Sequence, residues 1–453
     1  MSEKRSSFTG KIGFVLAAAG SAVGLGNIWR FPYLAAKYGG GIFLLVYIIL
    51  AVTFGFTLMV AEVAIGRKTG ISAIGAYKML DKRFSAVGWL AAVIPVVIMP
   101  YYSVIGGWVL KYMVGFLTGE GTAMAQQTYF TDYISETWEP LIWFAIVLTA
   151  AAVIVLCGVQ KGVEKVSKFM MPILVVLTVV IALYTIFAIP GAMEGVKYYL
   201  MPDFSKFSIM TVVAAMGQLF YSMSLAMGIM ITFGSYMKKD ISIEGAVSQV
   251  EIFDTGVAFL AGLMIIPAVF AFSGGDESAL NQGTGLMFVT LPKVFDAMPG
   301  GHAIGAAFFT MVLLAALTSI ISLMETIVST LQDKLSMSRR TAIFTTLVFG
   351  LLLGFVSAFG SSIWSGVRVL GMKIQDFFDF ISNSIMMPIV AFFTCLLVGY
   401  VIKPKAVAEE VELEGKRFRR KKLFSVVIRY IAPVCMVLIL ISSILDAFGI
   451  VKI

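Results

Sequence analysis

Small residues and hydroxyl groups interrupt two apolar stretches of this 453-residue chain. Gly20, Gly24 and Gly26 stand within one stretch, and the run from Ser222 to Gly228 stands within another. Because glycine costs about 1 kcal/mol relative to alanine inside a helix, both stretches predict open main chain. Free N–H groups at a helix terminus attract anions, and free carbonyl oxygens are ligands of hard cations. Both stretches are therefore candidates for binding a small charged ligand.

Further oxygen atoms lie on one face of a third apolar stretch. Ala315, Thr318, Ser319 and Ser322 follow the i, i+3, i+4, i+7 spacing of a helix face. Their hydroxyl and carbonyl oxygens suit a hard cation. Serine and threonine in such helices more often bond only to their own backbone, and this alternative stays open on spacing alone.

A carboxylate, Asp254, lies inside the apolar stretch 246–272. An ionised side chain is costly at such a position, and where one occurs it is a functional candidate by default. We therefore predict that Asp254 belongs to a binding site.

The composition indicates which elements position these residues. The chain is 59% hydrophobic and 13% charged, whereas a soluble domain is about a quarter charged. Runs of about 20 apolar residues cross a bilayer as helices. We predict an all-α integral membrane protein with about eleven spans, at approximately residues 11–37, 41–66, 85–116, 140–158, 165–187, 209–236, 246–272, 299–333, 340–358, 376–403 and 424–447.

This composition excludes a soluble enzyme, and no catalytic residues are predicted. No GxxxxGK[ST] loop occurs in the sequence, which disfavours an ATP-driven pump. Cys157, Cys395 and Cys435 lie in apolar stretches, and His302 is the only histidine. We therefore predict neither a disulfide framework nor a transition-metal site, and we expect no organic cofactor and no nucleic-acid partner.

The two interruptions fall in the first and the sixth predicted spans. Irregular main chain at membrane depth is tolerated only where it lines a cavity, and paired breaks are typical of inverted repeats. We predict a core at residues 1–403 built from two five-span repeats, at about 11–187 and 209–403. Glycines that only allow close helix packing are the alternative for a single break, but two breaks in corresponding positions favour the repeat.

Lysine and arginine crowd alternate loops, and the formal net charge is +8. The positive-inside rule places the crowded loops, and with them the N-terminus, in the cytoplasm. Residues 404–423 are predicted to be a solvated cytoplasmic connector, and residues 424–453 an additional span with a short outer tail. An odd number of spans leaves the C-terminus outside.

The residues around the first interruption resemble a known family. The segment Gly20–Pro32, GSAVGLGNIWRFP, is similar to the first-helix signature of the neurotransmitter:sodium symporters, the solute-carrier-6-like family. The likeness covers about residues 5–403, and the eleven spans resemble the bacterial amino-acid transporter branch. Further matching motifs follow in order at Tyr101–Tyr102, Gly217–Phe220, Ala315–Ser319 and Asp376–Asp379.

The resemblance implies a LeuT-type fold and a function. A member of this branch imports an amino acid together with sodium, by alternating access across the inner (plasma) membrane. The expected partners are a small-molecule amino acid and the lipid bilayer, with no obligate protein partner evident. Two sodium ions are expected to move with the substrate.

The resemblance also implies, position by position, the substrate site. The substrate carboxylate is expected to meet main-chain amides around Gly24–Gly26 and the Tyr102 hydroxyl, and the ammonium group to meet carbonyls of the sixth span. The pocket carries no charge, which predicts neutral, hydrophobic or aromatic L-amino acids. The implied residues are Ser21, Ala22, Gly24, Leu25, Gly26, Ile98, Tyr102, Phe220, Tyr221, Ser222, Ser224, Met227, Ser319 and Leu323.

Two sodium sites are implied in the same way. One consists of Ala22, Asn27, Ser222 and Asp254, completed by the substrate carboxylate. The other consists of Gly20, Val23, Ala315, Thr318 and Ser319.

Two positions bear on ion and substrate selectivity. Monoamine-transporting relatives resemble this chain except for an aspartate where Gly24 stands, so the substrate is expected to bring its own carboxylate. Chloride-dependent relatives have a serine where Ala258 stands. Asp254 is therefore expected to supply the negative charge that chloride supplies elsewhere, which makes transport chloride-independent.

Charged pairs resemble gates on both sides of the site. Arg30 and Asp379 resemble the outer gate, and Arg5 and Asp333 resemble the inner one.

Other positions have family counterparts with structural roles. Glu62 and Gln218 resemble a buried hydrogen-bonded pair, and Gly162 and Pro172 resemble a motif that lets the fifth span unwind. No role is predicted for Glu325.

We consider three alternative functions for this sequence: a proton-coupled or single-sodium transporter of the same fold, a transport-inactive amino-acid sensor, and a channel. A channel needs a continuous polar stripe or rings of like charge, and the sequence shows neither. A sensor is expected to lose sodium ligands or gate charges, and all of them are present. A differently coupled transporter remains the main alternative.

Overall fold

The computed structural model describes residues 7–274 and 284–447. Within these residues the chain is almost entirely helical, and paired extended chain is limited to isolated two-residue bridges. The predicted all-α fold is confirmed.

Nine continuous helical segments of the described chain are long and apolar enough to cross a membrane. Four are single helices: α9 (Glu139–Leu156), α14 (Ile243–Phe272), α16 (Gly301–Leu335) and α17 (Arg339–Phe359). Two begin with a differently wound turn: η3 (Lys82–Phe84) before α6 (Ser85–Thr118), and η4 (Val159–Glu164) before α10 (Lys165–Ala188). Three contain wide π-type turns: α3 (Gly41–Leu50), η2 (Ala51–Gly55) and α4 (Phe56–Thr69); α18 (Ile374–Asp379), η8 (Phe380–Met386), α19 (Met387–Leu396) and η9 (Leu397–Val401); and α21 (Lys421–Val426), η11 (Val427–Ile431) and α22 (Ala432–Ala447).

The first predicted span is broken. Its two halves are α1 (Lys11–Ala22) and the helix Gly26–Lys37, which consists of η1 (Gly26–Arg30) and α2 (Phe31–Lys37), and they meet at 55°. Val23, directly after α1, has extended main chain with φ −73° and ψ 101°. The break therefore lies among the glycines that the sequence singled out.

The sixth predicted span is broken as well. Non-helical Met223–Gly228 separates α12 (Ile209–Ser222) from α13 (Ile229–Ser235). Ser224 and Ala226 have positive φ angles of 53° and 60°, a conformation uncommon for residues other than glycine. Among the described residues, the nine continuous segments and the bent first pair give up to ten spans by length and composition, and α12 is a shorter apolar helix that with α13 would form one more. The predicted number of about eleven agrees approximately with this, and helices one and six are broken as predicted.

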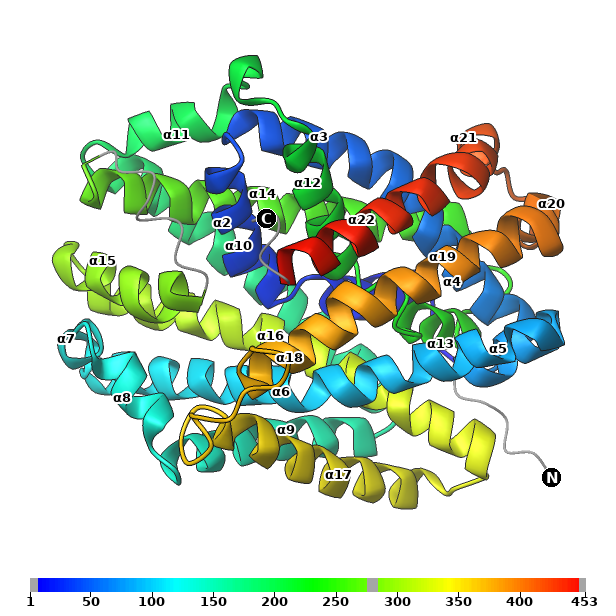
Figure 1. The fold of residues 1–453 in the computed structure, drawn as a ribbon, viewed down its shortest axis with the longest axis horizontal. Coiled ribbons are helices and arrows are strands. Elements are labelled where there is room, and N and C mark those ends of the chain that lie inside the picture. Colours follow the sequence, from blue (N-terminus) through cyan, green and yellow to red (C-terminus); the bar gives the residue numbers. More distant parts are fainter. Residues whose placement is uncertain (1–6, 275–283, 448–453) are drawn as a thin grey trace.

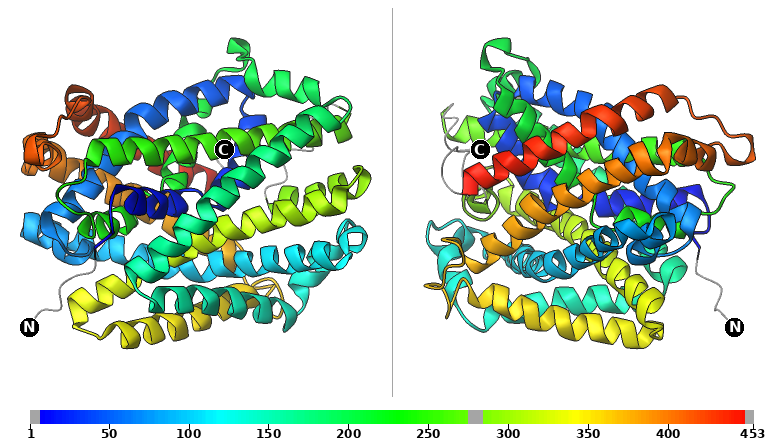
Figure 2. Two further views of the ribbon diagram at one scale, coloured as in Figure 1. Left: turned by 180° about the vertical axis from the view of Figure 1, so that it is seen from behind. Right: turned by 45° about the vertical axis from the view of Figure 1, so that its right-hand side comes forward.

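Long helices surround both breaks. α6 and α16 lie side by side through the middle of the molecule, and α16 also packs against α1 and α10 (Figure 1). α14 packs against α1 and α2, and α12 packs against α3 and α22. The views in Figure 2 show most long helices running in similar directions, so their ends gather at two opposite ends of the molecule.

We call one of these ends, on the right of Figure 1, the basic end; it carries residues 7–10, α5 (Ala73–Leu80), the end of α13 and α20 (Lys403–Val411). The opposite end carries α7 (Gly121–Met124), α8 (Tyr129–Ser135) and α15 (Leu291–Ala297). The remaining short helices are α11 (Ala192–Leu200), η5 (Phe204–Lys206), η7 (Leu286–Thr290) and η10 (Leu413–Gly415). Loops predicted to be cytoplasmic meet at the basic end, where Lys238 donates to the Thr9 carbonyl and Lys416 to the Lys239 carbonyl.

The segment 404–423, predicted to be a solvated connector, exposes many of its residues and packs others against the bundle. In α20, Val407 and Ala408 are buried, and the Glu410 carboxylate lies 2.7 Å from the Arg67 guanidinium of α4. Apolar side chains on one face of a charged helix let it dock, a pattern that the charge count of the segment hides.

Candidate substrate and cation site

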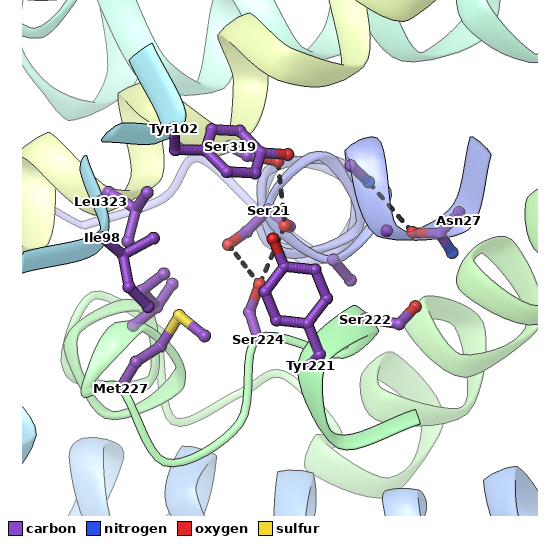
Figure 3. A pocket seen from close by; sticks show the side chains of 14 residues that line it. Ser21, Asn27, Ile98, Tyr102, Tyr221, Ser222, Ser224, Met227, Ser319 and Leu323 are labelled. Carbon is purple, nitrogen blue, oxygen red and sulfur yellow. Dashed lines mark hydrogen bonds between the residues drawn. The ribbon is translucent and has the colours of Figure 1, made fainter. Parts of the chain in front are cut away.

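A small cavity lies between the two breaks (Figure 3). Its volume is about 30 Å³, which is room for roughly one water molecule. We call it the central cavity. It is lined by Ser21, Ala22, Gly24, Gly26, Asn27, Ile98, Tyr102, Tyr221, Ser222, Ser224, Met227, Ile229, Ser319 and Leu323.

Main-chain N–H groups that have no helical partner at the first break form hydrogen bonds with polar side chains at this cavity. The Leu25 N–H donates to the Tyr102 hydroxyl oxygen at 2.8 Å, and the Gly24 N–H donates to Oδ1 of Asn27 at 3.1 Å. A hydroxyl that accepts a hydrogen bond keeps its own O–H as a donor. Tyr102 can therefore hold the broken main chain and donate to a bound anion.

Two serines tie the breaks to each other. The Ser224 hydroxyl donates to the Ser21 carbonyl at 2.9 Å, and the Ser21 hydroxyl lies 3.1 Å from Ser224 Oγ (Figure 3). The interrupted segments of α1 and α12 therefore form one continuous wall of the central cavity.

Glu62 and Gln218 each serve a different break. Glu62 accepts from the Ala226 N–H at 2.6 Å, and the Gln218 amide donates to the Gly26 carbonyl at 2.8 Å. Among the described residues they form no hydrogen bond with each other, so the paired arrangement expected from the resemblance is absent. Both side chains satisfy main-chain groups that a broken helix leaves open.

The glycines of the first break leave space that other side chains fill. A Cβ atom on Gly24 would lie 2.6 Å from the Tyr102 hydroxyl and 2.9 Å from Ser319 Oγ. A Cβ atom on Gly26 would lie 2.8 Å from the Tyr221 ring. A larger residue at either position would displace a wall of the central cavity.

Asp254 lies behind the central cavity, fully buried in α14. Its Oδ1 accepts from the Asn27 amide and from the Ser222 hydroxyl, both at 2.7 Å. Tyr47 donates to Oδ2 at 3.3 Å. The structure therefore brings together three members of the first predicted sodium set, and it adds Tyr47, which the sequence reasoning missed.

The second predicted sodium set joins α1 to α16. The Ser319 hydroxyl lies 3.5 Å from the Gly20 carbonyl oxygen and 3.1 Å from that of Ala315. Thr318 packs on Gly20, where a Cβ would lie 3.2 Å from the threonine side chain, and Val23 follows the end of α1. Hydroxyl and carbonyl oxygens from the two helices thus converge, which is the donor set a hard cation requires.

Most of the predicted substrate residues line the central cavity, with two exceptions. Leu25 faces an outer cavity instead, and Phe220 is buried away from the cavity wall. Tyr221, the next residue and also predicted, does line the cavity, since one step along a helix turns a side chain by about 100°. The reasoning from sequence missed Ile229, which lies in the wall after the second break.

Arg30 and Asp379, the predicted outer gate, both line the cavity that Leu25 faces, and both also line another cavity beside α22. Among the described residues they form no ion pair. The Arg30 guanidinium lies 5.2 Å above the Tyr221 ring, and Asp379 accepts from Tyr101 at 3.0 Å and from Asn383 at 2.6 Å.

At the basic end, Arg5 of the predicted inner gate lies outside the described residues. Asp333 accepts from the Ser72 N–H at 2.6 Å. Phe8 packs edge-on against Phe14, Phe233 and Tyr236 and closes this end with aromatic rings.

Glu325, without a predicted role, is fully buried at the same end. It accepts from the Tyr236 hydroxyl at 2.9 Å and forms an ion pair with Arg339. It therefore joins α16 to α17 and to the residue after α13.

Comparison with known proteins gives consistent matches. A model of the sodium:neurotransmitter symporter family matches residues 5–140 and 125–450. An uncharacterized sodium-dependent transporter of Bacillus subtilis, YhdH, is 34% identical over 98% of this chain and 99% of its own length. The human sodium- and chloride-dependent GABA transporter 2 is 26% identical over 90% of this chain and 75% of its own length.

A solved structure also matches. The crystal structure of MhsT in complex with L-phenylalanine has a TM-score of 0.88 and 36% identity, covering 97% of this chain and 100% of that chain. These matches establish a sodium-dependent, multi-pass membrane transporter rather than an enzyme. The broken helices, the oxygen-lined sites and the matches along almost the whole chain show that this protein belongs to the sodium:neurotransmitter symporter family and has its LeuT-type fold.

Proposed function

We propose that this protein imports neutral apolar or aromatic L-amino acids, each together with two sodium ions. The observation that carries the proposal is a cavity whose wall holds open main chain, hydroxyls and apolar side chains but no charged side chain. A zwitterionic amino acid supplies both charges itself, so a neutral wall with polar main chain suits it.

The carboxylate and ammonium groups have separate partners. The Tyr102 hydroxyl, which accepts from the Leu25 N–H at 2.8 Å, offers its own O–H to the carboxylate, at the start of the half-helix that begins with η1. A helix start favours a negative charge. Carbonyls of Tyr221, Ser222 and Ser224 at the second break offer acceptors for the ammonium group.

The side chain of the substrate would lie against Ile98, Met227 and Leu323. Since the central cavity is small, these side chains must move to admit it, and methionine adapts readily to different shapes. A structure of the similar protein MhsT contains L-phenylalanine, which supports an aromatic substrate here.

Sodium is cargo in this proposal. The first ion would use oxygens of Ala22, Asn27, Ser222 and Asp254 together with the substrate carboxylate, which couples ion and substrate binding. The second would use oxygens of Gly20, Val23, Ala315, Thr318 and Ser319. Two charges that cross 100 mV supply roughly 5 kcal/mol for accumulation.

Transport is proposed to need no chloride. Asp254 places a carboxylate directly on Asn27 and Ser222, so the negative charge beside the first ion is already part of the chain. Ala258, one turn along α14, is fully buried and offers no hydroxyl for an anion. We also propose that the basic end faces the cytoplasm, in agreement with the positive-inside rule.

Uptake by the purified protein in proteoliposomes tests the proposal. A panel of labelled amino acids is offered with an inward gradient of sodium, of protons or of neither, and with chloride or gluconate outside. We expect sodium-driven uptake of apolar or aromatic amino acids at equal rates in both anions. Uptake driven by protons alone would favour a proton-coupled transporter, and substrate binding without uptake would favour a sensor.

Two variants, one that removes the carboxylate at position 254 and one that also adds a carboxylate at position 258, test the role of Asp254. Asp254→Asn is expected to lose uptake in gluconate, and a second substitution, Ala258→Asp, is expected to restore part of it by returning the charge one turn away. Unchanged uptake by Asp254→Asn in gluconate would contradict the chloride argument.

A further inference from the structure

Glu164 joins the chain before α1 to the beginning of the fifth span. It is the last residue of η4 and its side chain is 1% exposed. Its carboxylate accepts from the Thr9 N–H at 2.9 Å and, through the other oxygen, from the Thr9 hydroxyl. Lys168, one turn further on, lies 2.6 Å from it. A carboxylate held in this way bridges two segments that are 155 positions apart.

Gly13 makes this contact possible. A Cβ atom on Gly13 would lie 2.2 Å from Glu164 Oε1 and 2.4 Å from its carboxyl carbon. No side chain larger than hydrogen fits while the carboxylate keeps its place. The Glu164 carboxylate therefore packs directly against the main chain of Gly13 in the first turn of α1.

Further hydrogen bonds fasten the same short segment. The Gln160 amide donates to the Ser7 carbonyl at 2.6 Å, and Lys238 donates to the Thr9 carbonyl at 3.1 Å. The Phe8 N–H donates to the Tyr236 carbonyl at 3.0 Å. Residues 7–13 are thus tied to η4 on one side and to the end of α13 on the other.

The η4 segment is a weak part of its span. It consists of wide π-type turns, and Gly158 before it has φ 89°. Such turns are rare inside α-helices and often occur at functional positions. Pro172 interrupts the hydrogen bonding of α10 further on. A contact that clamps η4 to α1 can therefore control whether both segments stay in place.

We infer that Glu164 is a positioning residue of transport, which couples release of residues 7–13 to loosening of the η4 turns. While Thr9 and Lys168 hold the carboxylate, both segments are closed. When residues 7–13 leave, the carboxylate loses two hydrogen bonds and water must replace them, so η4 opens with them. The inference rests on the proposed transport function, and it adds to the inner gate a link that involves neither Arg5 nor Asp333.

Four variants test this coupling. Glu164→Gln keeps the size and removes the charge, Glu164→Ala removes the contact, and Gly13→Ala inserts the clashing methyl group. The fourth is the double variant Gly13→Ala/Glu164→Ala. Glu251→Gln is the matched control, because Glu251 is another buried carboxylate at the basic end, paired with Arg420 instead.

Hydrogen–deuterium exchange of the full-length protein in lipid nanodiscs provides the first readout. With sodium present, we expect about tenfold or faster exchange in peptides covering 7–20 and 158–172 for Glu164→Gln and Gly13→Ala, since hydrogen bonds to a charged group are strong. Other peptides are expected to exchange as in the unmodified protein, and the control is expected to leave these two regions unchanged. Faster exchange throughout the molecule would indicate plain destabilisation and overturn the inference.

The double variant provides the second readout. If the methyl group of Gly13→Ala acts only by displacing the carboxylate, the double variant exchanges no faster than Glu164→Ala alone. If the increases in exchange rate caused by Gly13→Ala and by Glu164→Ala multiplied in the double variant, the two substitutions would act independently and the inference would be overturned.

Transport kinetics separate this inference from the proposed function. We expect Glu164→Gln to change the maximal rate and the KM for external substrate by different factors, while sodium dependence is retained. Absence of sodium-driven uptake in the unmodified protein would refute the proposed function, whereas unchanged uptake and unchanged exchange in Glu164→Gln would refute only the role of Glu164.

Discussion

The wall of the central cavity is neutral, whereas the basic end is held by ion pairs. No charged side chain lines the cavity, and the carboxylates near it, Asp254 and Glu62, are bonded to neutral groups. At the basic end the described residues include buried carboxylates paired with cations: Glu164 with Lys168, Glu251 with Arg420, Glu325 with Arg339, and Glu410 with Arg67.

This difference fits the proposed transport function, in which the central cavity receives cations and a zwitterion and the basic end opens to water. The wall of a cavity that receives cations and a zwitterion needs only neutral oxygens and N–H groups, because the transported ions and substrate bring the charges themselves. A closed end that must open to water can use charged groups, because water solvates both partners once they separate. The same low-dielectric interior thus favours neutral groups in one region and paired charges in the other.

Gly24→Asp places a charge in the neutral region and is expected to have the largest effect. The new side chain would start 2.6 Å from the Tyr102 hydroxyl and 2.9 Å from Ser319 Oγ. It would also compete with the carboxylate of an amino acid. Uptake of amino acids in proteoliposomes is expected to fall by about 100-fold or more, as when a buried charge is left without its partner. Near-normal uptake would show that the wall tolerates charge.

Arg67→Leu removes one charge from the basic end. The Glu410 carboxylate would be left buried without its cation, which costs about 3–5 kcal/mol. We expect a clearly lower midpoint of thermal unfolding in detergent, followed by tryptophan fluorescence. Arg67→Leu/Glu410→Leu replaces both charges by apolar groups and is expected to recover most of the loss. If the double variant were no more stable than Arg67→Leu alone, the positive charge of Arg67 itself would be needed for stability.

Tyr102→Phe removes one neutral hydroxyl from the central cavity. The substrate carboxylate loses the proposed hydrogen bond from the Tyr102 O–H, and a hydrogen bond to a charged group contributes about 1.5–3 kcal/mol. We therefore expect about 10- to 100-fold weaker binding of the substrate, measured by equilibrium binding of a labelled amino acid, with sodium still required. Trp108→Phe, away from the cavity wall, serves as the aromatic control.

Asp81→Asn alters an exposed pair at the basic end and is expected to have the smallest effect. Hydrogen bonds from Arg83 lower the pKa of Asp81 to about 2. A lowered pKa contributes stability above the unfolded value, and that contribution is lost only as the pH falls toward the lowered one. The pH profile of uptake between pH 5 and 8, measured in proteoliposomes, should therefore not change. A shifted profile would show that exposed charges matter as much as buried pairs.

The sequence alone was sufficient for the elements that carry the site. Runs of apolar residues predicted the spans, and the glycines near Gly24 and the small residues after Ser222 predicted the two breaks. These features are local, because main-chain preferences and membrane insertion act on one segment at a time. The helix face that carries Thr318 and Ser319 was also predicted from spacing alone, and a role for Asp254 was predicted from the energetic cost of a carboxylate in an apolar span.

Only the tertiary structure decided which side chains meet. It left Phe220 out of the cavity wall, put Tyr47 on Asp254, and separated Glu62 from Gln218. A helix that is apolar on all sides has no face that its sequence alone orients. Its rotation is set by packing against neighbours far away in the chain, as with Glu164 and Gly13, and that packing exists only in the folded protein.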